Sequence, residues 1–502
     1  MICISIGRTR HRKVIAEHQA LAQRGAELVE LRLDYLGRQP DFTRLLKDRP
    51  TPTLVTCRRQ SDRGRWRRSE EERLALLRAA IVAEVEYVDL EIDVAEGIPR
   101  YGKTQRIISY HNFDETPDDE DLLKIHNELC RLDPDIVKLV TMANSPGDMV
   151  RILQLVQSSG VPTIGFCMGE FGSPSRILCG KYGSPFTYAS FSSERELAPG
   201  QIAFDEMQDV YRYEDINAQT RVLGVIGDPI AQSLSPLLHN SAFQHEGVNA
   251  VYIPFRIPKG ELAETLEELE WLEVQGYSVT IPHKEAALKF SHRADAITKE
   301  IGAANTLTRD PYGVWSASNT DYEAALATLS QSLRAQGGRD ETLMGKKVLM
   351  LGAGGVARAI ALGLVRAGAG LTITARRHQQ AIDLAEQLNS QHVNWENRGT
   401  GFFDVIVNCT PVGMHPSVDE TPYPMRWFRD NMLVFDTVYN PENTLFLKEA
   451  RNHGCYTASG LEMFVRQAAF QYERFTGQNS PIDVMRETLR RSISPVSVET
   501  EA

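Results

Sequence analysis

A lysine within an apolar run is the first residue of this sequence whose position suggests chemistry. The stretch DPDIVKLVTMA (133–143) surrounds Lys138 with Ile, Val and Leu, and it is typical of a buried strand because it is too short for a helix. Burial disfavours an ammonium, so we expect the pKa of Lys138 to fall towards that of a nucleophilic amine. The alternative is a lysine at the end of the strand whose head reaches water.

Other polar residues end or follow expected strands in the first two hundred residues. They are Glu30, Arg32, Asp34, Arg58, His111 and Arg176. A lysine amine can condense with a ketone, a histidine can move the protons of that reaction, and arginines suit a carboxylate or a hydroxyl-rich substrate. The pattern therefore indicates Schiff-base chemistry, and a class I aldolase would use the same lysine.

The elements that must position these residues alternate between strand and helix. Strands are expected at ICISIG, LVELRLD, TLVTC, YVDLEID, RIISYHNF, DIVKLVT, PTIGFCM and FTYASF, with helical stretches such as EERLALLRAAIVAE between them. Eight strands with seven intervening helix-like segments predict a (β/α)8 barrel over residues 1–215. Such barrels carry their chemistry at the carboxyl ends of the strands.

Two further segments combine polar residues with the start of a helix. In GDPIAQSLSPLLHN (227–240), Ser233 and Ser235 can donate hydroxyl hydrogen bonds to an anion at a helix N-terminus, although serines at this position also serve as helix caps. In GYSVTIPHKEAAL (276–288), Lys284 lies in a first helical turn, against the preference of the helix dipole. This position indicates either a functional lysine or a solvated one.

A glycine-rich turn follows later in the chain. GAGGVA (352–357) lies between the strand KKVLML and the helix RAIALGLVRAG, which is the context of a dinucleotide-binding turn. Arg376 and Arg377 end the next strand, where NAD-binding chains carry an acidic residue, so they favour the 2′-phosphate of NADP. Two solvated arginines would be the alternative.

Composition narrows the class of protein. The net charge of −11 gives no general attraction to nucleic acid or anionic membranes, and the basic cluster at 58–68 is either a solvated loop or an anion-binding segment. Seven cysteines without paired spacing argue against disulfides and zinc, and no window approaches the ~18 apolar residues of a membrane span. The N-terminus MICISIGRTRHRK reads as a strand rather than a signal peptide. We expect a soluble, cytoplasmic protein without metal, nucleic-acid or membrane partners.

Residues 2 to 210 resemble type I 3-dehydroquinate dehydratase. The resemblance rests on ELRLD (30–34), TCR (56–58), SYHNF with His111, VKLV with Lys138, SR with Arg176, and APGQ (198–201). It implies that Lys138 forms a Schiff base, that His111 is the general acid and base, and that Arg176 binds the substrate carboxylate. The other substrate-binding residues that it implies are Ser5, Glu30, Arg32, Arg58, Asp62 and Gln201. Asp62 stands where the family usually has Glu, and Leu197 where it usually has Ser or Thr.

Residues 221 to 478 resemble shikimate dehydrogenase. The shared motifs are SLSP, VTIPHK, GAANT, NTD, GAGGVARA, NCTPVGM, VYNP and GLEMFVRQA. The resemblance implies that Lys284 and Asp321 handle the hydroxyl proton while hydride passes to or from nicotinamide. The substrate-binding residues that it implies are Ser233, Ser235, Thr280, Asn305, Tyr439 and Gln467. The NADP-binding residues that it implies are Gly352, Ala353, Gly354, Gly355, Val356, Arg376, Arg377, Thr410, Met414, Val438 and Gly460.

Both resemblances together predict a bifunctional shikimate-pathway enzyme of the α/β class. It would dehydrate 3-dehydroquinate to 3-dehydroshikimate and reduce that product to shikimate with NADPH. The expected domains are the barrel (1–215), a shikimate-binding α/β domain (221–340), a Rossmann-type NADP domain (341–455) and C-terminal helices (456–490) that pack back on the substrate domain. We expect a monomer or weak oligomer. The rival functions are quinate oxidation by the second half and a metabolite-sensing regulator, which would have lost catalytic residues.

Overall fold

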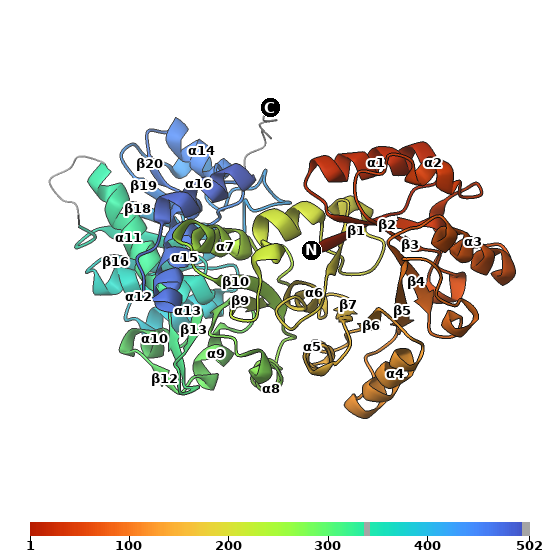
Figure 1. The fold of residues 1–502 in the computed structure, drawn as a ribbon. Coiled ribbons are helices and arrows are strands. Elements are labelled where there is room, and N and C mark those ends of the chain that lie inside the picture. The colour runs from red at the N-terminus through yellow and green to blue at the C-terminus, as the bar shows by residue number, and fades with distance from the viewer. Residues whose placement is uncertain (336–341, 494–502) are drawn as a thin grey trace. The chain divides into compact units, whose positions relative to one another are not determined.

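The computed structural model describes residues 1–335 and 342–493, which form two compact units (Figure 1). Unit 1 comprises Met1–Val222 with Asn249–Ile257 and Glu264–Val274, and unit 2 comprises the rest of the described chain. The expected domain boundary at 340/341 lies outside the described residues, and the other expected domain limits stay predictions.

Eight parallel strands form the sheet of unit 1, in the order β7-β6-β5-β4-β3-β2-β1-β8. Because β8 pairs with β1 in parallel, the sheet curls back on its first strand as a near-closed barrel. The predicted barrel and its eight strands are confirmed. The strands are β1 (Ile2–Ile6), β2 (Leu28–Arg32), β3 (Thr53–Thr56), β4 (Tyr87–Glu91), β5 (Gln105–His111), β6 (Ile136–Met142), β7 (Thr163–Met168) and β8 (Thr187–Ser190).

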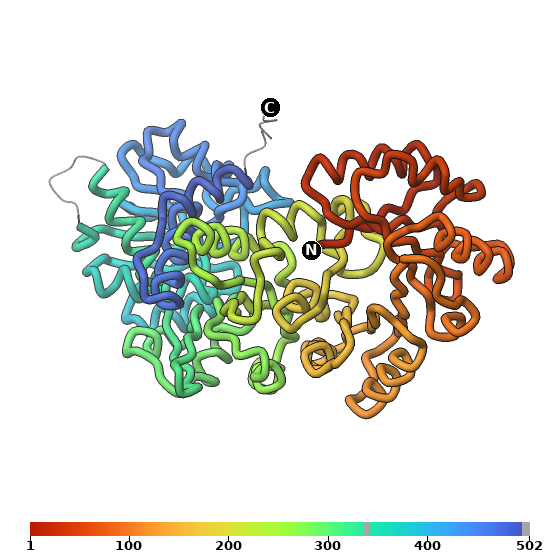
Figure 2. Tube along the Cα trace, in the orientation of Figure 1, coloured from red at the N-terminus to blue at the C-terminus, as the bar shows by residue number. Residues whose placement is uncertain are grey.

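The helices of unit 1 lie on the outside of the barrel (Figures 1 and 2). Strands such as β1, β3, β7 and β8 are buried at every residue, as expected for strands covered on both faces. They are α1 (His11–Gln23), α2 (Phe42–Leu46), α3 (Glu70–Val82), α4 (Asp119–Arg131), α5 (Asp148–Ser158) and α6 (Ser173–Leu178). Helix α3 begins with a capping box, in which Ser69 and Glu72 each accept a hydrogen bond from the other's backbone N–H. Between β4 and β5 the chain forms only the 3-10 helix η3 (Ala95–Gly97). The helix-like segment expected between these two strands is therefore a single short turn.

A mixed sheet carries the first segments of unit 2, with strands in the order β9-β11-β13-β14-β12. Strand β11 is parallel to β9 and antiparallel to β13. The strands of this region are β9 (Arg221–Gly227), β11 (Gly276–Val279), β12 (Arg293–Ala294), β13 (Thr306–Arg309) and β14 (Trp315–Ser318), whereas β10 (Ala250–Arg256) lies in a segment of unit 1. The helices are α7 (Ser235–Glu246), α9 (Lys284–Phe290), α10 (Ala296–Ile301) and α11 (Thr320–Ala335), whereas most residues of α8 (Leu262–Glu268) belong to unit 1.

A parallel sheet of order β17-β16-β15-β18-β19-β20 completes unit 2. The strand order reverses between β15 and β18, which is the arrangement of a Rossmann fold and confirms the prediction. The strands are β15 (Lys347–Leu351), β16 (Gly370–Thr374), β17 (Gln391–His392), β18 (Val405–Asn408), β19 (Leu433–Asp436) and β20 (Tyr456–Ala458). The helices are α12 (Gly355–Arg366), α13 (His378–Gln387), α14 (Leu445–Asn452), α15 (Gly460–Thr476) and α16 (Ile482–Ile493). Helix α15 contacts α11, and α16 contacts α7.

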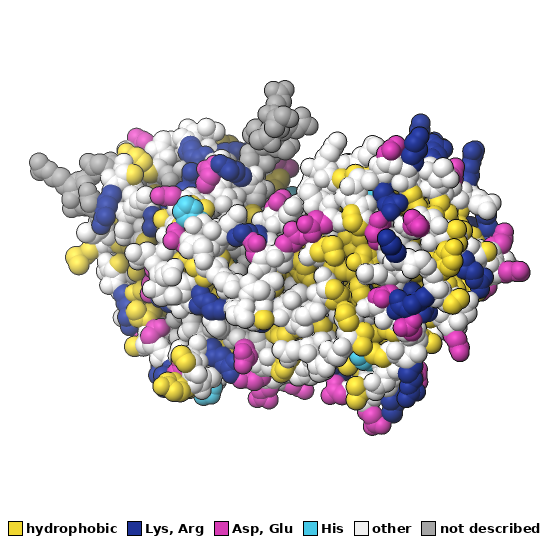
Figure 3. Space-filling view, in the orientation of Figure 1, with side chains coloured by type: hydrophobic (Ala, Val, Ile, Leu, Met, Phe, Trp, Pro, Cys, Tyr) yellow, Lys and Arg dark blue, Asp and Glu magenta, His cyan; other side chains and the backbone are white. Residues whose placement is uncertain are grey.

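The surface of the barrel mixes charges of both signs. On the face shown in Figure 3, Lys and Arg side chains are interspersed with Asp and Glu. The ion pairs of the barrel include that of Arg100 with Asp135, at 2.8 Å. No helix within residues 1–335 and 342–493 has the length and apolar character needed to cross a membrane.

Candidate active sites

One pocket of the barrel is lined by the nine residues to which the resemblance gave a role, whereas Asp34, the other polar residue that the sequence suggested, does not line it. The nine residues are Ser5, Glu30, Arg32, Arg58, Asp62, His111, Lys138, Arg176 and Gln201. Apolar and aromatic side chains close the same pocket, namely Phe113, Val140, Phe166, Met168, Tyr188 and Leu197. The first candidate site is therefore a pocket whose lining combines several cationic side chains, two carboxylates and a set of apolar side chains.

Lys138 lies in the middle of β6 and is 5% exposed. Its Nζ is 3.1 Å from Oδ2 of Asp89 on β4 and 4.0 Å from the ring centroid of Tyr188. The sequence neighbours of Lys138 are apolar, so sequence reasoning did not predict that the Asp89 carboxylate would be its partner. Burial by itself would raise the pKa of Asp89, but the neighbouring Arg58 and Lys138 hold it well below its usual range. Asp89 is therefore ionised, and the two side chains form a buried ion pair.

Arg58, just after β3, forms hydrogen bonds with side chains of β4 and β5. It donates through Nη2 to Asp89 Oδ1 at 2.9 Å and through Nη1 to Glu91 Oε1 at 3.1 Å. Ser109 on β5 completes this arrangement, because its hydroxyl donates to Asp89 Oδ1 at 2.6 Å and accepts from Arg58 Nη1 at 3.2 Å. The predicted substrate residue Arg58 thus also orders the carboxylate that pairs with Lys138.

His111 ends β5, the strand next to Lys138. Ser109 is the residue opposite Lys138 in the register of β5 and β6, so His111 follows two residues later on the same side of the sheet. Burial, together with Arg58 and Lys138, lowers the pKa of His111 well below its ordinary value. A neutral imidazole can accept one proton and return it, which is what general acid–base catalysis requires.

Arg176, on α6, is a buried cation without a carboxylate partner among the described residues. It is 1% exposed, its Nη2 donates to the carbonyl of Pro199 at 3.3 Å, and its guanidinium lies 4.5 Å from the ring centroid of Phe166. Its Nε has no hydrogen-bond partner within the part of the chain that the structure describes. Burial lowers the pKa of Arg176 to about 10, so it stays charged at neutral pH. Such a group is suited to an incoming anion.

The other predicted barrel residues already have protein partners. Glu30 accepts from Ser5 Oγ at 2.5 Å and from Thr56 Oγ1 at 2.7 Å. Arg32 is bidentate with Asp34, at 2.9 Å for each bond, and Gln201 Oε1 accepts from the backbone N–H of Leu197 at 2.9 Å. Asp62 accepts from Arg59 Nε at 2.5 Å, so its carboxylate is engaged within the basic cluster at 58–68.

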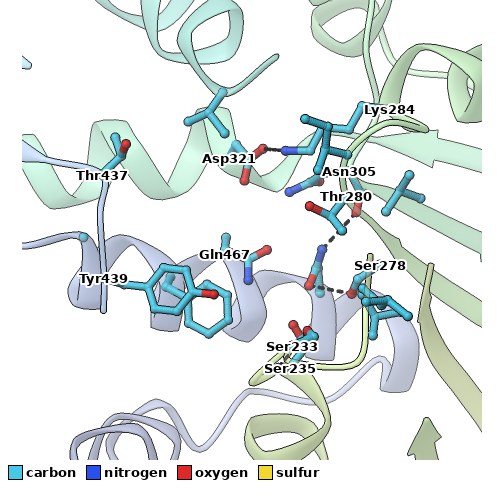
Figure 4. Close-up of a pocket in the computed structure, with 18 of the residues that line it drawn as sticks. Ser233, Ser235, Ser278, Thr280, Lys284, Asn305, Asp321, Thr437, Tyr439 and Gln467 are labelled. Carbon is cyan, nitrogen blue, oxygen red and sulfur yellow. Dashed lines mark hydrogen bonds and ion pairs between the residues drawn. The ribbon is translucent and has the colours of Figure 1, made fainter. Parts of the chain in front are cut away.

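The second pocket lies in unit 2 and brings together the eight predicted catalytic and substrate-binding residues (Figure 4). These are Ser233, Ser235, Thr280, Lys284, Asn305, Asp321, Tyr439 and Gln467. In Figure 4, the two serines lie at one side of the pocket and the pair Lys284–Asp321 at the other, with Gln467 between them. A small polar molecule can therefore contact hydroxyl groups at one end and an amine at the other.

Lys284 and Asp321 form an ion pair of 2.6 Å across the start of two helices. Their side chains are 15% and 8% exposed. Asn305 fixes the start of α11 beside Asp321, because its Oδ1 accepts from the backbone N–H of Thr320 at 2.8 Å and its Nδ2 donates to Thr320 Oγ1 at 3.0 Å. The carboxamide of Asn305 thus holds the helix that carries the acid, a use that the sequence did not predict.

Gln471 is a further residue of this pocket that sequence reasoning missed. It accepts from Ser278 Oγ at 2.8 Å and donates through Nε2 to Asn305 O at 3.0 Å and Thr306 Oγ1 at 3.1 Å. It lies four residues after Gln467 on α15, so helical periodicity places both on one face. That spacing was the available signal.

The predicted cofactor residues lie at the carboxyl ends of neighbouring strands of the Rossmann sheet. Gly352 follows β15 with φ of +111°, and a Cβ there would lie 2.9 Å from Cys409 O. A Cβ on Gly460 would lie 2.4 Å from Val438 O, so both glycines are required by close backbone approach. Ala353 and Gly354 lead into α12, which begins with Gly355 and Val356 and whose N-terminus is suited to a phosphate. Val356, Met414 and Gly460 also line the pocket that contains Lys284.

Two exposed arginines extend this edge. Arg376 and Arg377 follow β16, and neither forms an ion pair within residues 1–335 and 342–493. Thr410, after β18, donates through Oγ1 to Asn408 Oδ1 at 2.7 Å. The glycine turn, the helix N-terminus and the uncompensated guanidiniums fit a dinucleotide that carries a 2′-phosphate. Within the described residues, no group of three or more His, Cys, Asp or Glu is arranged to hold a metal ion.

Comparison with known proteins identifies the families to which the segments of the chain are similar. Residues 2–218 match the family model of type I 3-dehydroquinase, residues 225–307 the shikimate dehydrogenase substrate binding domain, and residues 460–490 the shikimate 5′-dehydrogenase C-terminal domain. Residues 347–424 match a family described as NADP oxidoreductase, coenzyme F420-dependent. The chain is therefore an enzyme in which a type I 3-dehydroquinase barrel is fused to a shikimate dehydrogenase.

Individual relatives lead to the same conclusion. The chain is 36% identical to the chloroplastic bifunctional 3-dehydroquinate dehydratase/shikimate dehydrogenase of Arabidopsis thaliana, over 96% of this chain and 83% of that protein. It is 37% identical to the shikimate dehydrogenase (NADP(+)) of Moorella thermoacetica, over 56% of this chain and 97% of that one. A crystal structure of a shikimate dehydrogenase in complex with NADP+ aligns with a TM-score of 0.51 and 33% identity, over 55% of this chain and 97% of that chain. The chain belongs to the family of bifunctional 3-dehydroquinate dehydratase/shikimate dehydrogenases, as the sequence predicted.

Proposed function

We propose that unit 1 dehydrates 3-dehydroquinate to 3-dehydroshikimate through a Schiff base on Lys138, and that unit 2 reduces this product to shikimate with NADPH. The observation that carries the proposal is the meeting of an amine, an imidazole and an unpaired guanidinium in one barrel pocket, those of Lys138, His111 and Arg176. The product of the first site is the substrate of the second, which gives the fusion of the two units a chemical reason.

In the barrel, the Lys138 ammonium first passes a proton to the neutral imidazole of His111, and the free amine then attacks the ketone carbon of 3-dehydroquinate. His111 returns the proton to the carbinolamine hydroxyl, which leaves as water, and an iminium remains. The iminium withdraws electrons from the neighbouring C–H bond, so His111 can take that proton and return it to the departing hydroxyl, which leaves as water. Hydrolysis of the iminium then releases 3-dehydroshikimate and the free amine. Arg176 binds the substrate carboxylate. The side chains that contact the ring and its hydroxyls are Ser5, Glu30, Arg32, Arg58, Asp62 and Gln201.

In unit 2, Ser233 and Ser235 bind the carboxylate of 3-dehydroshikimate through their hydroxyls. Bound NADPH supplies the hydride that reduces the ketone. Lys284 donates a proton to the developing alkoxide, and Asp321, 2.6 Å away, keeps the ammonium oriented towards the substrate. Thr280, Asn305, Tyr439 and Gln467 line the space around the ring.

The proposal is tested by trapping the first intermediate. Borohydride added with 3-dehydroquinate reduces the iminium to a stable secondary amine, and peptide mapping by mass spectrometry should find the adduct on the peptide that contains Lys138. An adduct on another lysine, or none under conditions of turnover, would contradict the assignment. Reduction of 3-dehydroshikimate with NADPH, measured on the same preparation, tests unit 2. The cytoplasmic location and the monomeric or weakly oligomeric state stay predictions of the sequence.

A further inference from the structure

A buried carboxylate lies at the cofactor edge of the Rossmann sheet. Asp436 is the last residue of β19 and is 0% exposed. In the sheet register it is paired with Asn408, the last residue of β18, and Asn408 is in turn paired with Leu351, which precedes the Gly352 turn. The ends of three neighbouring strands therefore meet here, at the edge where dinucleotides bind.

Three hydrogen bonds join Asp436 to different segments. Its Oδ1 accepts from Asn408 Nδ2 at 2.9 Å and from the backbone N–H of Val438 at 3.0 Å, and its Oδ2 accepts from Thr444 Oγ1 at 2.6 Å. Asn408 and Thr444 are also 0% exposed. A buried carboxylate with three donors links the end of β18, the residues that follow β19, and the start of α14.

This network extends to two of the cofactor-binding candidates. On one side, Asn408 Oδ1 accepts from the N–H of Thr410 at 2.9 Å and from its hydroxyl at 2.7 Å. On the other side, Val438 presents the carbonyl that a Cβ on Gly460 would approach to 2.4 Å. Asp436 is thus hydrogen-bonded directly to Val438 and is connected to Thr410 through Asn408. Asp436 itself does not line the pocket.

We propose that Asp436 is a positioning residue for NADP, which holds residues 408–410 and 437–438 in the arrangement that binds the cofactor. This inference rests on the proposed function of unit 2 as an NADP-dependent reductase. It assigns a role to a buried carboxylate that neither the sequence motifs nor the reaction uses directly.

The protonation of Asp436 suggests how to test this role. Burial raises its pKa to about 6, although the hydrogen bonds from Thr444, Val438 and Asn408 act in the opposite direction. When Oδ2 carries a proton, the Thr444 hydroxyl can turn and accept from it, so both bonds to Oδ1 persist. Asparagine can reproduce that pattern, with its amide nitrogen donating to Thr444. Asp436→Asn should keep the network, whereas Asp436→Ala removes it.

The experiment measures NADP+ binding directly, by isothermal titration calorimetry, alongside steady-state kinetics of the full chain. Asp436→Ala should raise the Kd for NADP+ about tenfold, which corresponds to ~1.4 kcal/mol. The KM for shikimate at saturating NADP+ should change less than about twofold, and Asp436→Asn should bind NADP+ within about threefold of the wild type. Asp430→Ala is the matched control, because Asp430 is an exposed carboxylate before the opposite end of β19. Dehydratase activity, measured on each variant, shows whether unit 1 is still folded and active.

The inference is overturned if Asp436→Ala binds NADP+ as the wild type does, or if KM for shikimate and Kd for NADP+ rise together by the same factor. If Asp436→Ala does not fold, Asn408→Ala replaces it. This change removes the branch towards Thr410 and the bond from Nδ2 to Val412 O at 3.3 Å, but it keeps the bonds from Val438 and Thr444 to Asp436, and it should also weaken NADP+ binding. A wild-type chain that does not bind NADP+ at all would instead contradict the proposed function of unit 2.

Discussion

Lys138 Nζ lies 3.1 Å from Asp89 Oδ2 inside the barrel, and the two side chains are 6% and 0% exposed. The same carboxylate accepts from Arg58 at 2.9 Å through its other oxygen. One buried anion therefore faces two cations, and it fixes the position of the amine that we propose to form the Schiff base.

Asp89→Asn should impair both the stability of the barrel and the dehydratase. Removing the charge leaves Lys138 without its anion and Arg58 with Glu91 alone, which costs about 3 kcal/mol or more. The amine also loses the partner that positions it, and a misplacement of about 1 Å can lower the rate on the order of 100-fold. Dehydratase kcat/KM and calorimetric unfolding measure the two effects.

Reduction of 3-dehydroshikimate is the internal control for that variant, because Asp89 belongs to unit 1 alone. Combining Asp89→Asn with Lys138→Met should recover part of the lost stability, since the double variant has one uncompensated cation fewer. Equal stability of Asp89→Asn and the wild type would show that the ion pair has no structural value.

The pH dependence of the dehydratase should reflect the lowered pKa of His111. Burial, Arg58 and Lys138 keep its imidazole neutral below the ordinary value of 6.5. The unfolded chain takes up a proton near pH 6.5 while the folded chain does not, so the stability contributed at this site is lost as the pH falls below 6.5. We expect the acidic limb of kcat/KM for 3-dehydroquinate to lie below pH 6.5. A limb above that value would contradict the assignment of His111 as the neutral proton acceptor.

Much of the barrel could be predicted because its strands are covered on both faces and therefore appear as short apolar runs. The polar residues interrupting these runs marked the pocket, and His111, Lys138 and Arg176 do line one cavity. Asp89 was missed, although it alternates with Glu91 along YVDLEID as Glu30 does with Arg32. The period of two indicates that such residues face inward, but the identity of the partner depends on the register of β4 against β6 through β5, which a single sequence does not contain.

The connection between β4 and β5 shows a second limit. Residues 92–104 separate the two strands, and a parallel crossover needs about a dozen residues even without extra turns, so only η3 fits. Asn305 and Gln471 show a third limit, because side chains that hold a helix start or bridge two strands are recognisable only once their partners are placed.

Lys284→Ala should abolish the reduction of 3-dehydroshikimate and leave the dehydration of 3-dehydroquinate unchanged. Loss of the ammonium removes the proton donor, which is worth about 100- to 10,000-fold in rate, and leaves Asp321 without its 2.6 Å partner. Lys289→Ala is the matched control, since Lys289 is exposed on the same helix. If the dehydratase falls together with the reductase in Lys284→Ala, the two units are not catalytically independent.

The double change Arg376→Ala and Arg377→Ala should weaken binding of NADP+ but not of NAD+. Both side chains are exposed after β16, and neither is neutralised by an ion pair among the described residues, so a 2′-phosphate is the anion that would gain from them. We expect the Kd for NADP+ to rise about tenfold or more, since hydrogen bonds to charged groups contribute about 1.5–3 kcal/mol. Calorimetric titration with each cofactor measures the ratio, and steady-state assays of quinate with NAD+ and of shikimate with NADP+ test whether substrate preference follows. An equal rise of the Kd for NADP+ and for NAD+ would show that the two arginines do not bind the 2′-phosphate. The preference for NADP would then need another structural cause.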